Sequence, residues 1–271
     1  MPSSNPAFSR LGGAGNGQQQ SAGWGVQPQP QYGAPAQYDP YAAPSPYAAT
    51  TTQYLTMDDV VAKTGISFLV TVLAAAAVWA LPGQAAWGLA LPAVLVAFVL
   101  GLVISFKQIA NPAATLSYGA LYGIALGAIS EAFNTFYPGI VMQAVIGTFG
   151  VFAGMLVVYK TGAIRVTPKF TRWLLAAMIG VFVLMAANFI GALIGGGDGL
   201  GLRDGGPLAI VFSLVVIGVA AFSLLLDFDM ADEAIRRGAP AKFAWYIAFG
   251  LLVTVVWLYL EILRLLSYFR E

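Results

Sequence analysis

Four carboxylates in strongly apolar surroundings are the residues of this chain best placed to do chemistry. They are Glu131, Asp227, Asp229 and Glu261, and each lies within or at the end of a long apolar stretch. An ionisable side chain inside a bilayer costs roughly 2.5 to 3.5 kcal/mol on insertion scales, so a carboxylate there is a functional candidate by default. Such groups can bind protons or hard cations such as calcium.

The remaining composition excludes most other chemistries. The 271 residues include no Cys and no His, which excludes disulfides, thiol nucleophiles, Cys/His zinc sites and Ser-His or Cys-His catalytic pairs. The 13 Lys and Arg are almost balanced by 12 Asp and Glu, so no basic field is present to hold nucleic acid. We therefore expect a protein that is not an enzyme, uses no cofactor and binds no nucleic acid.

The elements that position the carboxylates are apolar stretches, each long enough for a helix across a bilayer of about 30 Å. The chain is 59% hydrophobic and only 9% charged, and Pro and Gly separate the stretches. The predicted helical cores are 60–81, 85–106, 113–133, 139–159, 170–194, 207–226 and 243–263. The sequence thus predicts an all-α membrane protein with seven transmembrane helices over residues 56–271.

The segment before these helices, residues 1–55, has a different composition. It is rich in Pro, Gln, Gly and Tyr and has two formal charges, Arg10 and Asp39. Such a segment buries too little apolar surface to order itself, so we predict a disordered tail. It lacks the pattern of a cleaved signal peptide. Protein partners are expected to bind through this tail if it acts as a contact segment.

The distribution of Lys and Arg predicts the orientation in the membrane, because cytoplasmic loops carry the excess. Residues 160–172 and 236–242 hold most of the basic side chains, whereas Arg203, Arg264 and Arg270 fall on the other side. This pattern places the N-terminus in the cytoplasm and, with seven spans, the C-terminus outside.

Glu131 follows three glycines at a spacing of four, Gly119, Gly123 and Gly127, which would form a groove for a neighbouring helix. Glu131 lies about 40° around the helix from Gly127, so it is expected to face protein rather than lipid. A carboxyl bonded to a neighbouring helix only for packing is the alternative to a functional role.

The carboxylates of the last two helices have different local partners. Glu261 has Arg264 three residues later, and an interfacial pair that anchors the helix end is the alternative to a functional Glu261. Asp227 and Asp229 have no basic residue close by on their own helix. Their counter-charge must come from elsewhere, and the candidates are Lys107, a bound cation or a proton.

Several segments resemble the Bax inhibitor-1 (transmembrane Bax inhibitor motif, YccA-like) family, in particular an actinobacterial type with a Pro/Gln/Tyr-rich tail. They are 129–133 (ISEAF), 137–148 (YPGIVMQAVIGT), 226–229 (LDFD) and 257–266 (WLYLEILRLL). The resemblance implies a seven-helix protein of the bacterial inner (plasma) membrane that acts as a pH-sensitive calcium leak channel.

The same resemblance implies roles for the candidate residues. An acidic pair on the last two helices would form a proton-linked gate, with Asp227 or Asp229 on one helix and Glu261 on the other. Asp227 and Glu261 would be transient calcium ligands, Glu131 would match the acid of the third helix, and Lys107 is the nearest substitute for a basic partner on helix two. In a straight hairpin that turns near residue 240, Asp229 and Glu261 differ in depth by about 15 Å. Bringing them level would require a broken helix or a water-filled path.

Two other functions are compatible with the residues. One is a non-conducting membrane interaction or regulatory protein, whose polar residues bond helices together and whose tail recruits partners. The other is a proton-coupled transporter, although no internal repeat of the kind found in many transporters is evident. Loss of ion flux on neutralising the acidic residues would distinguish a channel from an interaction protein.

Overall fold

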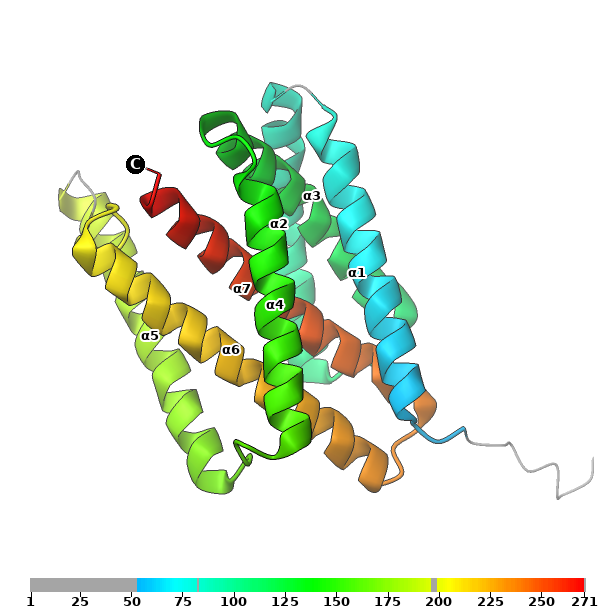
Figure 1. Ribbon diagram of the computed structural model, residues 1–271. Helices are drawn as coiled ribbons and strands as arrows, with labels where there is room; N and C mark the ends of the chain where they lie inside the picture. Colours follow the sequence, from blue (N-terminus) through cyan, green and yellow to red (C-terminus); the bar gives the residue numbers. More distant parts are fainter. Residues whose placement is uncertain (1–52, 82, 196–198, 271) are drawn as a thin grey trace, which may run out of the picture. The chain divides into compact units, whose positions relative to one another are not determined.

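The computed structural model describes residues 53–81, 83–195 and 199–270, and within these ranges the chain forms seven long helices and one short 3-10 helix (Figure 1). The elements are α1 (Met57–Trp79), α2 (Gly83–Lys107), α3 (Pro112–Phe136), α4 (Ile140–Thr161), α5 (Pro168–Gly195), α6 (Pro207–Arg236), η2 (Ala241–Phe243) and α7 (Ala244–Tyr268). All seven long helices are long and apolar enough to cross a membrane. The prediction of a seven-helix, all-α membrane protein is confirmed.

Local sequence explains where the helices begin. Thr56 caps α1 through a reciprocal pair of hydrogen bonds with Asp59, and Asn111 caps α3 just before Pro112. Helix α4 begins after Gly139, whose φ of 82° is readily adopted only by glycine. The predicted breaks between helices therefore coincide with real turns.

Helix α6 continues beyond its predicted apolar core, 207–226, and ends at Arg236. Its additional turns carry exposed ion pairs, including Asp232 with Arg236 and Glu233 with Arg237 at i,i+4 spacing. These pairs support helix where the sequence is no longer apolar. Asp227 and Asp229 consequently lie inside a continuous helix and not at its end.

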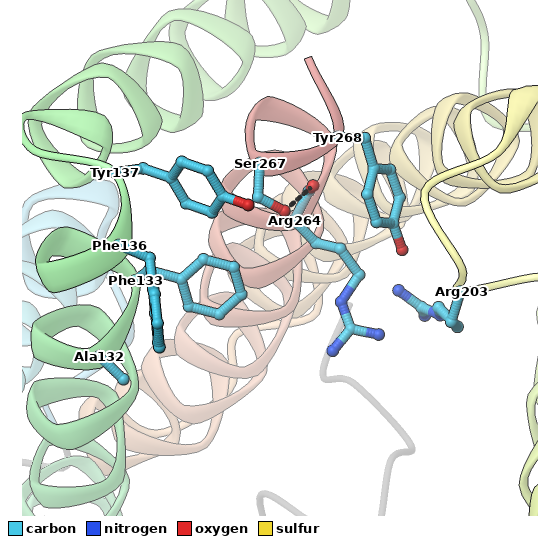
Figure 2. A pocket seen from close by; sticks show the side chains of 8 residues that line it. All are labelled: Ala132, Phe133, Phe136, Tyr137, Arg203, Arg264, Ser267 and Tyr268. Atoms are coloured by element: carbon cyan, nitrogen blue, oxygen red, sulfur yellow. Dashed lines mark hydrogen bonds between the residues drawn. The ribbon is translucent and has the colours of Figure 1, made fainter. Parts of the chain in front are cut away.

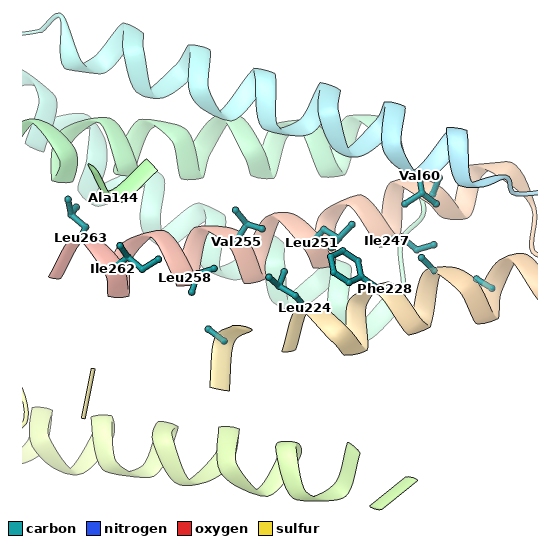
Figure 3. Packing of buried hydrophobic residues seen from close by; sticks show 14 of the residues in the cluster. Val60, Ala144, Leu224, Phe228, Ile247, Leu251, Val255, Leu258, Ile262 and Leu263 are labelled. Atoms are coloured by element: carbon teal, nitrogen blue, oxygen red, sulfur yellow. The ribbon is translucent and has the colours of Figure 1, made fainter. Parts of the chain in front are cut away.

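Helix α7 lies at the centre of the bundle. It packs against α1, α3, α4 and α6, and 72% of its most apolar window is buried, compared with 6% for α5. Helix α6 crosses beside α7 in Figure 1, and the largest apolar cluster joins these two helices to α1 and α4 (Figure 3). Any polar side chain on the inner face of α7 is therefore held inside protein.

The glycine groove predicted on α3 receives α1. A Cβ on Gly123 would collide with the carbonyl oxygen of Thr71, and a Cβ on Gly127 with that of Ala75. Only residues without a side chain allow the backbones of α1 and α3 to approach so closely. The prediction that these glycines accept a neighbouring helix is confirmed.

The chain just before α1 is bound to the connection between α6 and α7. The Leu55 amide donates to the Ala239 carbonyl at 2.8 Å, and the Ala241 amide donates to the Gln53 carbonyl at 2.7 Å. Leu55 is 3% exposed. Residues 53–55, assigned to the tail by composition, thus pack with the helices, while residues 1–52 of the predicted disordered tail lie outside the described residues.

The outward surfaces of several helices suit a lipid environment. Exposed apolar side chains include Leu95 and Phe98 on α2 and Phe182, Phe189 and Leu193 on α5. A soluble protein rarely exposes such continuous apolar surface. Together with the seven apolar helices, this surface identifies a multi-pass membrane protein.

Candidate ion-pathway site

The two aspartates of α6 point to different neighbours. Asp227 faces α7, where its Oδ1 lies 3.6 Å from the position that a Cβ on Gly250 would take. Asp229 faces α4, where the Tyr159 hydroxyl donates to its Oδ1 at 3.5 Å. Residues two apart on a helix differ by about 200° in direction, so the two carboxylates serve opposite faces. Asp227 is therefore the member of the pair that faces the bundle core.

The Asp227 carboxylate has an unmet polar atom. Its Oδ2 is shielded from solvent and has no hydrogen-bond partner among the residues that the structure describes. The nearby hydroxyl of Thr254 donates to the Gly250 carbonyl at 3.2 Å. A shielded carboxylate oxygen without a partner is costly when the group is ionised, and a proton or a cation at Asp227 would remove that cost.

Asp229 has a more open setting, at the end of the bundle where α1 begins. The Tyr159 hydroxyl lies between two acids, at 3.5 Å from Asp229 and 3.4 Å from the Oδ2 of Asp232. Asp232 also pairs with Arg236 at 3.1 Å. Asp229 and Asp232 thus form a partly solvated acidic cluster beside Tyr159, between the adjacent ends of α4 and α6.

Glu261 forms an ion pair that sequence reasoning missed. Both of its oxygens accept from the guanidinium of Arg203, at 3.1 and 2.9 Å, and the side chains of Arg203 and Glu261 are only 17% and 7% exposed. Arg203 comes from the α5–α6 connection and also lies over the Phe212 ring, 5.6 Å from its centroid. Among the described ion pairs, Glu261 therefore pairs with Arg203 and not with Arg264, the partner that the sequence suggested.

The structure does not bring Asp227 and Glu261 together. Asp227 lies at the level of Gly250, and Glu261 follows Gly250 by eleven residues on α7, which corresponds to about 16 Å. Fully buried Leu224 and Leu258 belong to the apolar cluster that occupies the intervening level (Figure 3). The described residues contain no group of three or more acidic, His or Cys side chains that could hold a metal ion.

Glu131 and Lys107 lie elsewhere. Glu131 is half-buried near the end of α3, where its Oε1 accepts from the Thr135 hydroxyl at 3.3 Å and its Oε2 is 4.0 Å from a Cβ built on Gly83. It therefore faces the beginning of α2. Lys107 is exposed at the end of α2 and makes no ion pair with the described residues, so it does not serve as the partner of Asp227 here.

Two hollows lie at the end of the bundle that holds Glu261. They measure about 390 Å³ and 380 Å³, and Phe133, Arg203 and Arg264 line both. Glu261 lines the second. The first, which opens between the ends of α3 and α7, is shown in Figure 2. The Arg203–Glu261 pair thus lies beside these hollows. Buried leucines separate Asp227 from this end of the bundle.

The model of one protein family, described as Bax inhibitor 1 like, matches residues 5–271. No curated protein matches the chain.

Proposed function

Since this chain belongs to the Bax inhibitor 1 like family, we propose that it is a pH-sensitive calcium leak channel of a bacterial inner membrane. The single observation that carries the proposal is the partly buried Asp227 carboxylate on a membrane helix, whose Oδ2 is shielded from solvent and lacks a hydrogen-bond partner among the described residues. An unsatisfied acid in that position is suited to exchange a proton for a cation.

In this proposal Asp227 is the residue that binds calcium within the pathway. Its carboxylate oxygens are the ligands that calcium prefers, and Gly250 leaves room beside them. When Asp227 holds a proton, the charge that attracts the cation is absent and the path is closed. When the proton leaves, the carboxylate requires a counter-ion and the path is open to calcium.

The leucines at the next level form the barrier. Leu224 and Leu258 are fully buried in one cluster, so calcium passes only if α6 and α7 separate there. The ion pair of Glu261 with Arg203 ties the connection before α6 to the end of α7 and thereby holds the closed packing. Release of this pair would also supply a second carboxylate ligand, from Glu261.

The other acids have supporting roles. Asp229, beside Asp232 and Tyr159, attracts cations to the end of the bundle where α1 begins. Glu131 does so at the opposite end, near the start of α2. The charge pattern assigns the first of these ends to the cytoplasm, together with the N-terminus. Lys107, exposed and outside the core, is a candidate partner only after a rearrangement.

The test is calcium entry into liposomes that contain the purified full-length protein, measured with an enclosed dye over about pH 6 to 8, because burial raises the pH at which a carboxyl group gives up its proton. Asp227→Asn is compared with Asp229→Asn, a matched change two residues away on the opposite face. We expect Asp227→Asn to abolish the pH dependence and Asp229→Asn to retain it.

Two results would contradict the proposed channel function or the role of Asp227 in it. If folded wild-type protein passes no calcium at any pH, the channel function is excluded, and a non-conducting interaction protein becomes the better account. Equal effects of the two substitutions would remove Asp227 from the pathway.

A further inference from the structure

The first hollow, at the end of the bundle opposite the start of α1, is lined by two arginines and, within residues 199–270 and the other described ranges, by no acidic residue. It measures about 390 Å³ and lies between the end of α3, the α5–α6 connection and the end of α7 (Figure 2). The guanidinium groups of Arg203 and Arg264 both reach it, and none of the described residues that line it is Asp or Glu.

The two arginines differ in how their charge is balanced. Arg203 is neutralised by its paired hydrogen bonds to Glu261. Arg264 is half-buried and forms no ion pair with the described residues. Counted over the described residues, the hollow therefore has one positive charge in excess of its negative charge, which is unfavourable for a partly buried cation.

Tyr268 provides an independent sign that an acceptor belongs in this hollow. The residue is 9% exposed, and its hydroxyl oxygen is shielded from solvent and makes no hydrogen bond with the described residues. Figure 2 shows this hydroxyl directed toward the same space as the two guanidinium groups. The neighbouring Ser267 hydroxyl already donates to the Arg264 carbonyl at 2.7 Å. Buried tyrosine hydroxyls normally have a partner, so this one indicates an absent acceptor.

We propose that this hollow is a binding site for a phosphate group, held by the Arg264 guanidinium and the Tyr268 hydroxyl. A guanidinium offers a planar fork of N–H donors that matches two phosphate oxygens, and the phenol adds a third donor. The excess positive charge selects an anion over a neutral acceptor. This inference does not depend on the proposed channel function.

The surroundings allow two sources of the phosphate. The hollow lies at helix ends beside the apolar side chains of Phe133 and Phe136. If the phosphate of an anionic phospholipid occupied it, the glycerol and acyl chains of that lipid would lie against the two rings. Dissolved inorganic phosphate is the other source. Both make the same contacts with Arg264 and Tyr268, and the experiment distinguishes them.

The test uses full-length protein purified in detergent. Binding of inorganic phosphate is measured by calorimetric titration, and binding of phosphatidylglycerol by native mass spectrometry, with diacylglycerol as the lipid that lacks a phosphate. The variants are Arg264→Gln and the conservative Tyr268→Phe. The matched control is Arg270→Gln, because Arg270 lies in the same region but donates to the Pro138 carbonyl and to Gln143 instead of lining the hollow.

We expect wild type to bind at least one phosphate probe and not diacylglycerol. Arg264→Gln and Tyr268→Phe should each weaken binding by about tenfold or more, as expected for hydrogen bonds to a charged group, while Arg270→Gln binds as wild type does. Binding of phosphatidylglycerol but not of inorganic phosphate identifies a lipid site, and the converse identifies a site for the free anion.

Two results would overturn the proposal. They are absence of binding by either probe, and binding that is unchanged in both Arg264→Gln and Tyr268→Phe. Because Tyr268→Phe removes only an oxygen atom, the test does not depend on whether Arg264→Gln folds.

Discussion

Glu261 on the central helix α7 and Arg203 in the α5–α6 connection form a two-bonded ion pair across 58 positions of sequence, with oxygen–nitrogen distances of 2.9 and 3.1 Å. The pair is largely shielded from water and fixes the entry to α6 against α7. It binds one of the four acids identified from the sequence to a residue that no local pattern associates with it. Its first consequence concerns stability.

Replacing Arg203 with Gln should destabilise the protein more than replacing both partners. The single substitution leaves the carboxylate of Glu261 buried without its counter-ion, a change that costs about 3 to 5 kcal/mol when a buried pair is broken. The double variant Arg203→Gln/Glu261→Gln removes both charges and should recover much of the loss. Thermal unfolding in detergent measures the difference, and a single variant as stable as wild type would contradict the buried pair.

Neutralising Asp227 should leave the protein as stable as wild type or more stable at pH 7. The substitution Asp227→Asn removes an acid whose Oδ2 has no hydrogen-bond partner among the described residues, and with it the cost of burying a charge. Asp229→Asn, beside Tyr159, serves as the control and should change the melting temperature little. A marked loss of stability in Asp227→Asn alone would show that the carboxylate has a structural partner.

Adding a methyl group in the α3 groove should separate α1 from α3. Gly123→Ala places a Cβ against the Thr71 carbonyl, and overpacking of this kind costs about 1 to 3 kcal/mol. Gly150→Ala on α4 is the matched control, because no heavy atom lies within 4 Å of its added Cβ. Unfolding of the two variants in the same detergent gives the comparison, and equal stabilities would argue against the close helix contact.

Shortening a leucine of the barrier should increase calcium leak if the proposed pathway is right. Leu258→Ala opens space in the cluster that also contains Leu224, between the levels of Asp227 and Glu261, and it should raise the liposome flux most at the upper end of the pH range, where Asp227 is ionised. The control is Leu95→Ala, which shortens a lipid-facing side chain of α2. A flux that stays at the wild-type level in Leu258→Ala would place the barrier elsewhere.

The sequence predicted the helices and one helix contact because both depend on local patterns. Apolar length determines a membrane span, and Gly119, Gly123 and Gly127 fall on one side of a helix whatever lies opposite. The apolar core predicted for α6 ends at residue 226, and the i,i+4 spacing of Asp232 with Arg236 and of Glu233 with Arg237 is the local pattern that extends the helix beyond its apolar part.

The partners of the acids could not be predicted in the same way. Spacing alone places Asp227 and Asp229 on opposite sides of α6, but the rotation of α6 against α4 and α7 decides which acid faces the core. Arg203 gave a weak signal as a solitary basic residue in a short connection on the side of the membrane predicted for the C-terminus. A contact between such distant segments depends on how the bundle packs, and no single stretch of sequence contains that information.

The backbone bonds of Gln53 and Leu55 to Ala241 and Ala239 connect the segment just before α1 to the turn between α6 and α7. The Lys63 ammonium reinforces this connection by donating to the Ala241 carbonyl at 2.8 Å. Tension applied to the N-terminal segment would therefore reach the turn between α6 and α7 directly, without passing along α1. A partner that pulls on this segment would transmit force to the two helices that carry Asp227 and Glu261.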